Sequence, residues 1–378
     1  MALGLFSRRQ SSMVGVDIGT SRIKLVELAK RGESVELVRM AVELTPPDTI
    51  RDGVVVDPEL VAEVLANGLK SGHIKGRQVV AAIAGQGVVV RHVRFPRMPE
   101  AELREALKWE GEKYIPFPLD EAVVDFEIMD GPEGAESQEM EVMLVAAQRR
   151  IVDSHVRALE LAGLKPIAID VQPFTVLRAL TYHPGDSAMG RANGSAATAY
   201  LDIGAGTTDI VIAEGQRLRF TRIIPSGGNS FTRAIAERLN IGFEEAERIK
   251  IHEAELWEEG PEPPEGTSER ARMIHEAVLE VAQDIATDVR RSLDYHDLQL
   301  QGRFENAGVT KVIMTGGGSA LRGFGKFLES ELGLPTTTGD PLSELAVSPR
   351  LPGQEDILRL GPMLAVGIGL ALREVVPS

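Results

Sequence analysis

The chain is 378 residues long, which is enough for two or more domains and a large buried core. Its formal net charge of -15 argues against a general nucleic-acid binder, because phosphate neutralisation needs a basic surface. The absence of cysteine excludes disulfides and thiolate metal sites, and none of the seven histidines forms a short ligand pair, so a zinc site is not expected.

The first half begins with alternating apolar and polar residues over 13–45, which predict three strands in series. A helix is expected after Asp57, because an Asp N-cap followed by Pro58 is typical of helix starts. The elements expected next are strands at 78–84 and 87–95, a helix at 99–115, and strands at 121–130 and 139–148. Residues 46–150 are therefore predicted to be a small α+β insertion.

The second half repeats this opening. A helix, a strand and a helix over 151–182 complete the first half, and the Gly- and Ser-rich stretch 183–196 is interpreted as the seam. Three strands over 197–226 then restart the meander. The elements expected after it are a helix at 230–240, a long helix with an apolar stripe from Ile274 to Leu293, a strand-turn-helix unit at 311–333, and a closing helix at 361–375. This order predicts a duplicated α/β domain.

Both halves carry an Asp-x-Gly turn after their first strand. One such turn alone is explained by a plain β-hairpin, but two copies at corresponding points favour a shared site. Their N–H groups and hydroxyls are suited to binding a polyphosphate from two sides, and Asp17 and Asp202 to holding a hydrated Mg²⁺ between them. The predicted clamp residues are Asp17, Gly19, Thr20, Ser21, Lys24, Asp202, Gly204, Gly206, Thr207 and Thr208.

A third glycine cluster follows the strand at 311–315. Gly316, Gly317 and Gly318 precede Ser319, which is expected at or near a helix N-terminus, where backbone can approach a flat ring or a sugar closely. The cluster does not follow the dinucleotide-binding or Walker patterns, so both of those site types are disfavoured.

Together these three motifs resemble the phosphate and adenosine motifs of the actin, heat-shock chaperone and sugar-kinase superfamily of ATP-binding proteins. The resemblance implies a duplicated actin-like (ribonuclease H-like) ATPase fold. It also implies further nucleotide contacts near ribose and adenine, from Gly227, Gly228, Asn229, Glu247 and Lys250.

Gln172 stands where the superfamily places a residue that orients the attacking water. An amide can orient water but hardly deprotonate it, so slow ATP hydrolysis at most is the expectation. The alternative is that Gln172 only satisfies backbone groups at a helix start.

The insertion inside the first half resembles the FtsA and PilM families, which carry an SHS2-like subdomain there. The run from Trp109 to Phe117 is particularly similar to PilM. The alternative for Trp109, Tyr114, Ile115 and Phe117 is that they simply form the core and hinge of the insertion. The implied subdomains are 1A at 13–45 and 151–190, closed by 361–375; 1C at 46–150; 2A at 196–225 and 309–360; and 2B at 226–308.

This resemblance implies a cytoplasmic ATP-binding scaffold or switch of type IV pilus assembly at the inner face of the cytoplasmic membrane. Its partner is expected to be the cytoplasmic N-terminal peptide of PilN, bound in a groove between 1C and 1A. Other pilus platform and motor proteins are further expected partners, and formation of a homo-oligomer is left open. The longest apolar run near the termini, 361–372, is shorter than the roughly 20 residues of a membrane span, so membrane contact is expected only through a partner. A filament-forming division protein of FtsA type and a small-molecule kinase remain alternatives.

Overall fold

The computed structural model describes residues 12–129, 138–184, 196–257, 266–300, 308–351 and 353–376. The predicted seam at 183–196 lies almost entirely outside the described residues. Among the described helices, none combines the length and the apolar character needed to cross a bilayer.

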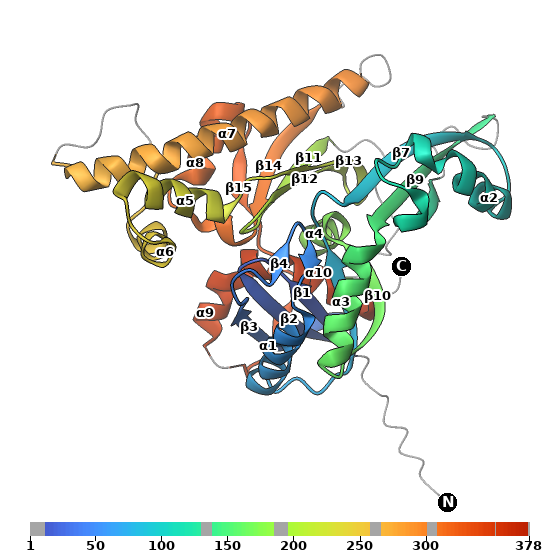
Figure 1. The fold of residues 1–378 in the computed structure, drawn as a ribbon, viewed down its shortest axis with the longest axis horizontal. Helices are drawn as coiled ribbons and strands as arrows, with labels where there is room; N and C mark the ends of the chain where they lie inside the picture. Colours follow the sequence, from blue (N-terminus) through green and yellow to red (C-terminus); the bar gives the residue numbers. More distant parts are fainter. Residues whose placement is uncertain are drawn as a thin grey trace, which may run out of the picture.

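The first half is built on a six-stranded sheet (Figure 1). Strands β1, β2 and β3 form the predicted antiparallel meander, and β6 and β10 extend it in parallel on the other side of β1. The order across the sheet is β10 (Lys165–Val171), β6 (Gln78–Ile83), β1 (Ser12–Ile18), β2 (Arg22–Arg31), β3 (Ser34–Leu44) and β16 (Ala346–Val347).

Helices cover both faces of this sheet. On one face, α1 (Pro58–Ser71) and α3 (Arg149–Leu161) bury Leu65 and Leu159 against Val16 of β1. The predicted start of α1 is confirmed: the side chain of Asp57 accepts a hydrogen bond from the N–H of Leu60 at 3.0 Å, which satisfies one otherwise free helix donor.

On the other face lie α4 (Gln172–Thr181) and α10 (Ala365–Val375), which also touch the second half of the molecule. Val176 of α4 and Leu370 of α10 belong to one apolar cluster with Tyr200 and Val211 of the second sheet. Because α10 is covered on nearly all sides, its residues are apolar or small almost throughout, as a fully buried helix requires.

The second sheet repeats the strand order of the first. Its strands are β13 (Arg217–Ile224), β12 (Thr208–Glu214), β11 (Ala197–Ile203), β14 (Val309–Thr315) and β15 (Thr336–Thr338). Again the first three form an antiparallel meander and the next two run parallel to its first strand. The outer face is covered by α5 (Gly228–Leu239), α6 (Phe243–His252), α7 (Glu269–Leu300) and α8 (Phe324–Leu332).

The insertion is a three-stranded antiparallel sheet with one helix. The strand order is β7 (Val88–Pro96), β9 (Glu139–Gln148) and β8 (Ala122–Met129), and α2 (Glu100–Glu110) packs Leu103 and Leu107 against it. Ile115 is buried and Tyr114 and Phe117 are half-buried in this core, in agreement with the core alternative. Trp109 is 82% exposed, so it is not part of this core.

Two predicted boundaries differ from the structure. The range 46–150 includes β4 (Ile50–Arg51), β5 (Val54–Val55), α1 and β6, but β6 is a central strand of the first sheet, so the separate sheet begins only at β7. Within 309–360, β16 pairs with β3, and Ile357 of α9 (Gln354–Leu360) packs in the first half. Periodicity identifies a strand but not the sheet that it joins, because pairing depends on distant residues.

Candidate functional site

The two Asp-x-Gly turns have the same backbone geometry. Asp17 lies opposite Lys24 in the β1–β2 hairpin, and Asp202 lies opposite Asp209 in the β11–β12 hairpin. Each turn is closed by one backbone bond from its first glycine: the N–H of Gly19 to the carbonyl of Arg22 at 3.1 Å, and that of Gly204 to the carbonyl of Thr207 at 2.9 Å. The duplication predicted from the sequence is therefore present in the structure as two hairpins with the same register of paired residues.

The turns face each other across the junction of the two halves. A Cβ atom built on Gly206 would lie 3.3 Å from Oγ1 of Thr20, so the backbone of the second turn approaches a hydroxyl of the first. The charges of Lys24 and Asp17 also act on the pKa of Asp202. The structure thus brings the two turns of the predicted clamp together, although the hydroxyl of Thr208 is fully buried and donates to the carbonyl of Ser226 at 2.8 Å.

The first turn is electrostatically paired. Nζ of Lys24 donates to Oδ2 of Asp17 at 2.7 Å, and both side chains are largely buried. The turn is tethered by Thr45, a residue that the sequence analysis missed, whose hydroxyl donates to the carbonyl of Gly19 at 2.6 Å and whose N–H donates to Ser21 at 3.0 Å. Thr45 lies beyond the strand next to the turn, and no local pattern marks it.

The second turn concentrates carboxyl groups. Asp202 and Asp209 are both buried, and neither oxygen of Asp209 has a hydrogen-bond partner of normal geometry among the described residues. Burial raises the pKa of Asp209 to about 8, with a further rise from Asp202 and a lowering by Thr207. Burial likewise raises the pKa of Asp202 to about 6, against the lowering effects of Gln172 and Lys24.

Asp209 was not among the predicted site residues. A signal for it was present, because it occupies in the second hairpin the place that Lys24 occupies in the first. A buried carboxylate without a partner is costly, and the cost is removed by a proton or by a cation.

Gln172 lies at this acidic pair. Its Nε2 donates to Oδ2 of Asp202 at 2.5 Å, so its side chain bonds to the second turn and not to backbone groups at the start of α4. The helix-start alternative is therefore wrong for the side chain. Its role in orienting water stays a prediction.

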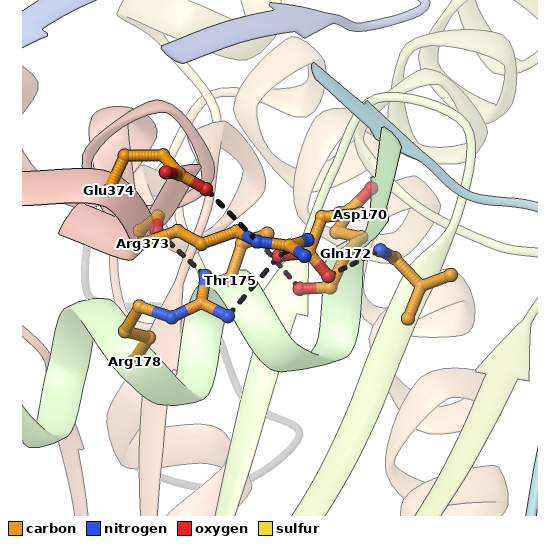
Figure 2. A network of polar contacts seen from close by, with 8 residues as sticks. Asp170, Gln172, Thr175, Arg178, Arg373 and Glu374 are labelled. Carbon is orange, nitrogen blue, oxygen red and sulfur yellow. Dashed lines mark hydrogen bonds and ion pairs between the residues drawn. The ribbon is translucent and has the colours of Figure 1, made fainter. Parts of the chain in front are cut away.

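The junction that carries Gln172 is fixed by an ion-pair network (Figure 2). Oδ2 of the buried Asp170 lies 3.2 Å from Nη2 of Arg178 and 3.4 Å from Nη1 of Arg373, and Arg178 also donates to the carbonyl of Gly369 at 2.8 Å. Figure 2 shows both guanidinium groups directed at Asp170, beside Gln172. The network ties β10, α4 and α10 together where the two halves meet.

The start of α5 lies against the second turn. The N–H groups of Gly228 and Asn229 donate to the carbonyls of Gly204 and Ala205 at 2.9 and 2.8 Å. A Cβ atom on Gly227 would lie 2.6 Å from the carbonyl oxygen of Gly204, so no larger residue fits at this crossing.

Glu247 and Lys250 of α6 lie against the start of α5. Nζ of Lys250 donates to Glu247 at 2.6 Å, to the carbonyl of Gly228 at 3.0 Å and to the hydroxyl of Thr232 at 2.9 Å. The structure therefore places both predicted residues near the second turn, already bonded to each other.

The third glycine turn packs beneath the second. Gly316 has φ +81, and a Cβ atom there would lie 2.4 Å from Oδ1 of Asp202, so only glycine fits. The expected position of Ser319 at a helix start is wrong. Residues Gly317–Ala320 form a 3₁₀ turn, the hydroxyl of Ser319 donates to the carbonyl of Gly316 at 2.7 Å, and α8 begins at Phe324.

The residues at the two turns fit a phosphate ligand, but they form only part of a site for its accompanying cation. The glycines, hydroxyls and Lys24 are suited to phosphate, and the unpartnered Asp209 beside Asp202 is suited to a cation. In the described part of the chain, however, no three acidic or histidine side chains already form a ligand set, and Asp17 is neutralised by Lys24. Magnesium held through water stays a prediction.

Two matching sheets, each opening with an Asp-x-Gly hairpin and joined through α4 and α10, define an actin-like ATPase fold, as predicted. A family model described as type IV pilus assembly protein PilM matches residues 15–375. The chain belongs to this PilM family, as the resemblance of the sequence indicated.

Solved structures agree with this assignment. A structure described as the PilM-PilN type IV pilus biogenesis complex superposes with a TM-score of 0.82; it is 30% identical and the match covers 97% of this chain and 100% of the other. MreB5 of Spiroplasma citri bound to AMPPNP has a TM-score of 0.52 and 16% identity, covers 95% of this chain and 94% of its own, and shows the shared fold alone.

Relatives among cell division proteins are more distant. FtsA of Neisseria meningitidis serogroup B is 24% identical over 367 residues, which are 89% of this chain and 85% of FtsA. FtsA of Bacillus subtilis is 25% identical, with 82% and 74% covered. The PilM assignment is therefore favoured over the FtsA alternative.

Proposed function

We propose that this chain binds ATP with Mg²⁺ between its two facing turns and acts as a scaffold or switch in type IV pilus assembly. The observation that carries the proposal is the pair of Asp-x-Gly turns in identical register, facing each other in a member of the PilM family. The AMPPNP-bound MreB5 structure, which shares the fold, supports a nucleotide ligand.

In this proposal the glycines and hydroxyls of both turns hold the phosphates. Lys24 lies ready to exchange part of its bond to Asp17 for a phosphate oxygen. A bound Mg²⁺ supplies positive charge for the phosphates and relieves the buried Asp202 and Asp209. Gln172 orients water without removing its proton, so hydrolysis is slow.

The partner in the proposal is the cytoplasmic N-terminal peptide of PilN. The match to a PilM-PilN complex over nearly the whole chain supports it. In the proposal the peptide binds in a groove between the inserted sheet and the first half. Capture of this peptide would hold the protein at the inner face of the cytoplasmic membrane through its partner.

Calorimetric titration tests both parts of the proposal. The full chain is titrated with Mg-ATP and, separately, with a synthetic PilN N-terminal peptide, with and without nucleotide. We expect Asp202→Ala to weaken ATP binding by about tenfold or more, and Asp153→Ala, which changes an exposed aspartate of α3, to leave it unchanged. Equal ATP affinity in both variants would show that the turns are not the site.

The titration with the peptide tests the partner independently of ATP binding. Peptide binding whose affinity changes with ATP supports the switch, whereas ATP binding without any peptide response rejects PilN as the partner. ATP-dependent sedimentation in that case would favour the filament-forming function of the FtsA relatives.

A further inference from the structure

The inserted sheet is joined covalently only to the first half but packs against the second. The chain enters β7 from β6 and leaves β9 into α3, and both β6 and α3 belong to the first half. Met143 of β9 nevertheless lies in one apolar cluster with Val211 and Leu218 of the second sheet. Figure 1 shows β7 and β9 beside β13.

A polar cluster accompanies this contact. Oε2 of Glu141, on β9, lies 3.1 Å from Nη2 of Arg217, on β13, and Oε1 of Glu141 lies 3.3 Å from Nδ1 of His92, on β7. We call His92, Glu141 and Arg217 the clasp. Arg217 is the member that belongs to the second half, so the Glu141–Arg217 pair joins the insertion to that half.

The side chains of the clasp are partly buried and electrostatically coupled. The side chain of Arg217 is 18% exposed, and Nε of Arg217 and Nε2 of His92 are buried without hydrogen-bond partners among the described residues. The bond from His92 and the nearby charges of His92, Arg217 and Arg219 hold the pKa of Glu141 down at about 2. Glu141 is therefore ionised at every ordinary pH.

The clasp is connected to the second turn by a single hairpin. Strand β12 begins at Thr208 and Asp209 in the site and ends at Glu214, which lies opposite Arg217 at the start of β13. At about 3.4 Å per residue, β12 spans roughly 20 Å between the site and the clasp. Because hydrogen bonds pair β12 with β13, the two strands move together. A displacement of the hairpin near Asp209 is therefore expected to displace Arg217 as well.

We propose that the β12–β13 hairpin and its clasp transmit occupancy of the cleft to the inserted sheet. A cation drawn toward Asp209, bound together with phosphates held by the glycines and hydroxyls of the turns, shifts the site end of the hairpin, and the Glu141–Arg217 pair carries that shift into β9 and β7. This inference rests on the proposed nucleotide binding and adds the route by which it reaches the insertion.

The chain offers a matched control for the clasp. Arg219 lies on the same strand as Arg217 and has the same exposed fraction of 18%, but it pairs with Glu214 of its own hairpin at 2.6 Å. Arg217→Gln breaks the link between the halves, whereas Arg219→Gln removes an equal charge without breaking it. Glu141→Gln breaks the same Glu141–Arg217 ion pair by changing its partner on the inserted sheet.

Hydrogen exchange of the full chain with and without Mg-ATP gives the readout. We expect ATP to protect 17–24 and 202–209 in all variants and to change exchange in 88–96 and 139–148 in the wild type and Arg219→Gln. In Arg217→Gln and Glu141→Gln that second change is expected to fall by about threefold or more, and the double variant to be no worse than either single one.

The outcomes separate the two proposals. If ATP protects the turns but the inserted sheet responds equally in Arg217→Gln and the wild type, or does not respond in the wild type, the clasp proposal is overturned while nucleotide binding stands. If ATP protects neither turn, both are overturned. Equal losses in Arg217→Gln and Arg219→Gln would assign the effect to lost charge and reject the clasp.

Discussion

The two turns share one backbone and differ in charge. In the first, Asp17 lies opposite a lysine and forms a 2.7 Å ion pair; in the second, Asp202 lies opposite another aspartate, and neither oxygen of Asp209 has a normal hydrogen-bond partner. The first turn is electrostatically complete without a ligand, whereas the second is stabilised by adding a proton or a cation. In the proposed function the two copies of the hairpin have different roles: the first presents the ammonium group of Lys24 to phosphate, and the second attracts a cation.

Replacing Lys24 with Met tests the pairing of the first turn. Asp17 would remain buried without its cation, so we expect the free energy of unfolding at pH 7 to fall by about 3 kcal/mol, the lower end for breaking a buried ion pair. Urea unfolding measures the loss. Lys30→Met, at an exposed position of the same strand, is the control, and equal losses in the two variants would contradict the assigned pairing.

Replacing Asp209 with Asn tests the unpaired second turn. The folded-state pKa of Asp209, about 8, lies above its ordinary 3.8, so the folded chain holds a proton that the unfolded chain releases between those values. Stability should therefore fall as pH rises from about 4 to 8. Asp209→Asn should gain roughly 2 kcal/mol at pH 8 without ligand, since the amide can donate to Asp202.

The same variant should lose Mg²⁺-dependent ATP affinity by about tenfold while it gains stability. Unfolding midpoints at pH 5, 6.5 and 8 give the slope, with the exposed Asp284→Asn as control. An unchanged pH slope in Asp209→Asn would show that this residue is not the source of the effect.

Replacing Gln172 with Ala removes the hydrogen bond that the first half donates to Asp202 of the acidic pair. Because that bond lowers the pKa of Asp202, the loss is expected to depend on pH: about 1.5 kcal/mol at pH 8, where Asp202 is ionised, and less at pH 5. Gln283→Ala on the exposed face of α7 is the control. Equal losses at both pH values would argue against an ionised Asp202 as the acceptor.

Replacing Gly206 with Ala changes the spacing between the turns and little else. The added methyl would lie 3.3 Å from Oγ1 of Thr20, a tight contact without a strained backbone, so the cost in stability should stay near about 0.5 kcal/mol. We expect ATP affinity to fall by several-fold. Gly242→Ala, which meets nothing within 4 Å but replaces the N-cap residue of α6, should leave ATP affinity unchanged, and an ATP affinity unchanged in Gly206→Ala would place the ligand elsewhere.

The hairpins, their duplication and most of the site follow from local sequence. Alternation of apolar residues predicts both meanders, and the Asp-x-Gly patterns place Asp17 and Asp202 at corresponding turns. Periodicity also predicts the insertion, and family resemblance added its SHS2-like character and the PilM assignment; the family model confirmed the PilM assignment. These features are readable because each depends on residues close together in the chain.

Tertiary structure decided how those pieces combine. Only the folded chain shows that β6 and β16 join the first sheet, that Thr45 tethers the first turn, and that α8 begins after Ser319. Burial left the carboxyl of Asp209 without a partner and raised its pKa, and packing brought Glu141 of the insertion against Arg217 of the second half. Pairing, desolvation and ion-pair contacts of this kind depend on residues far apart in sequence, so no local pattern determines them.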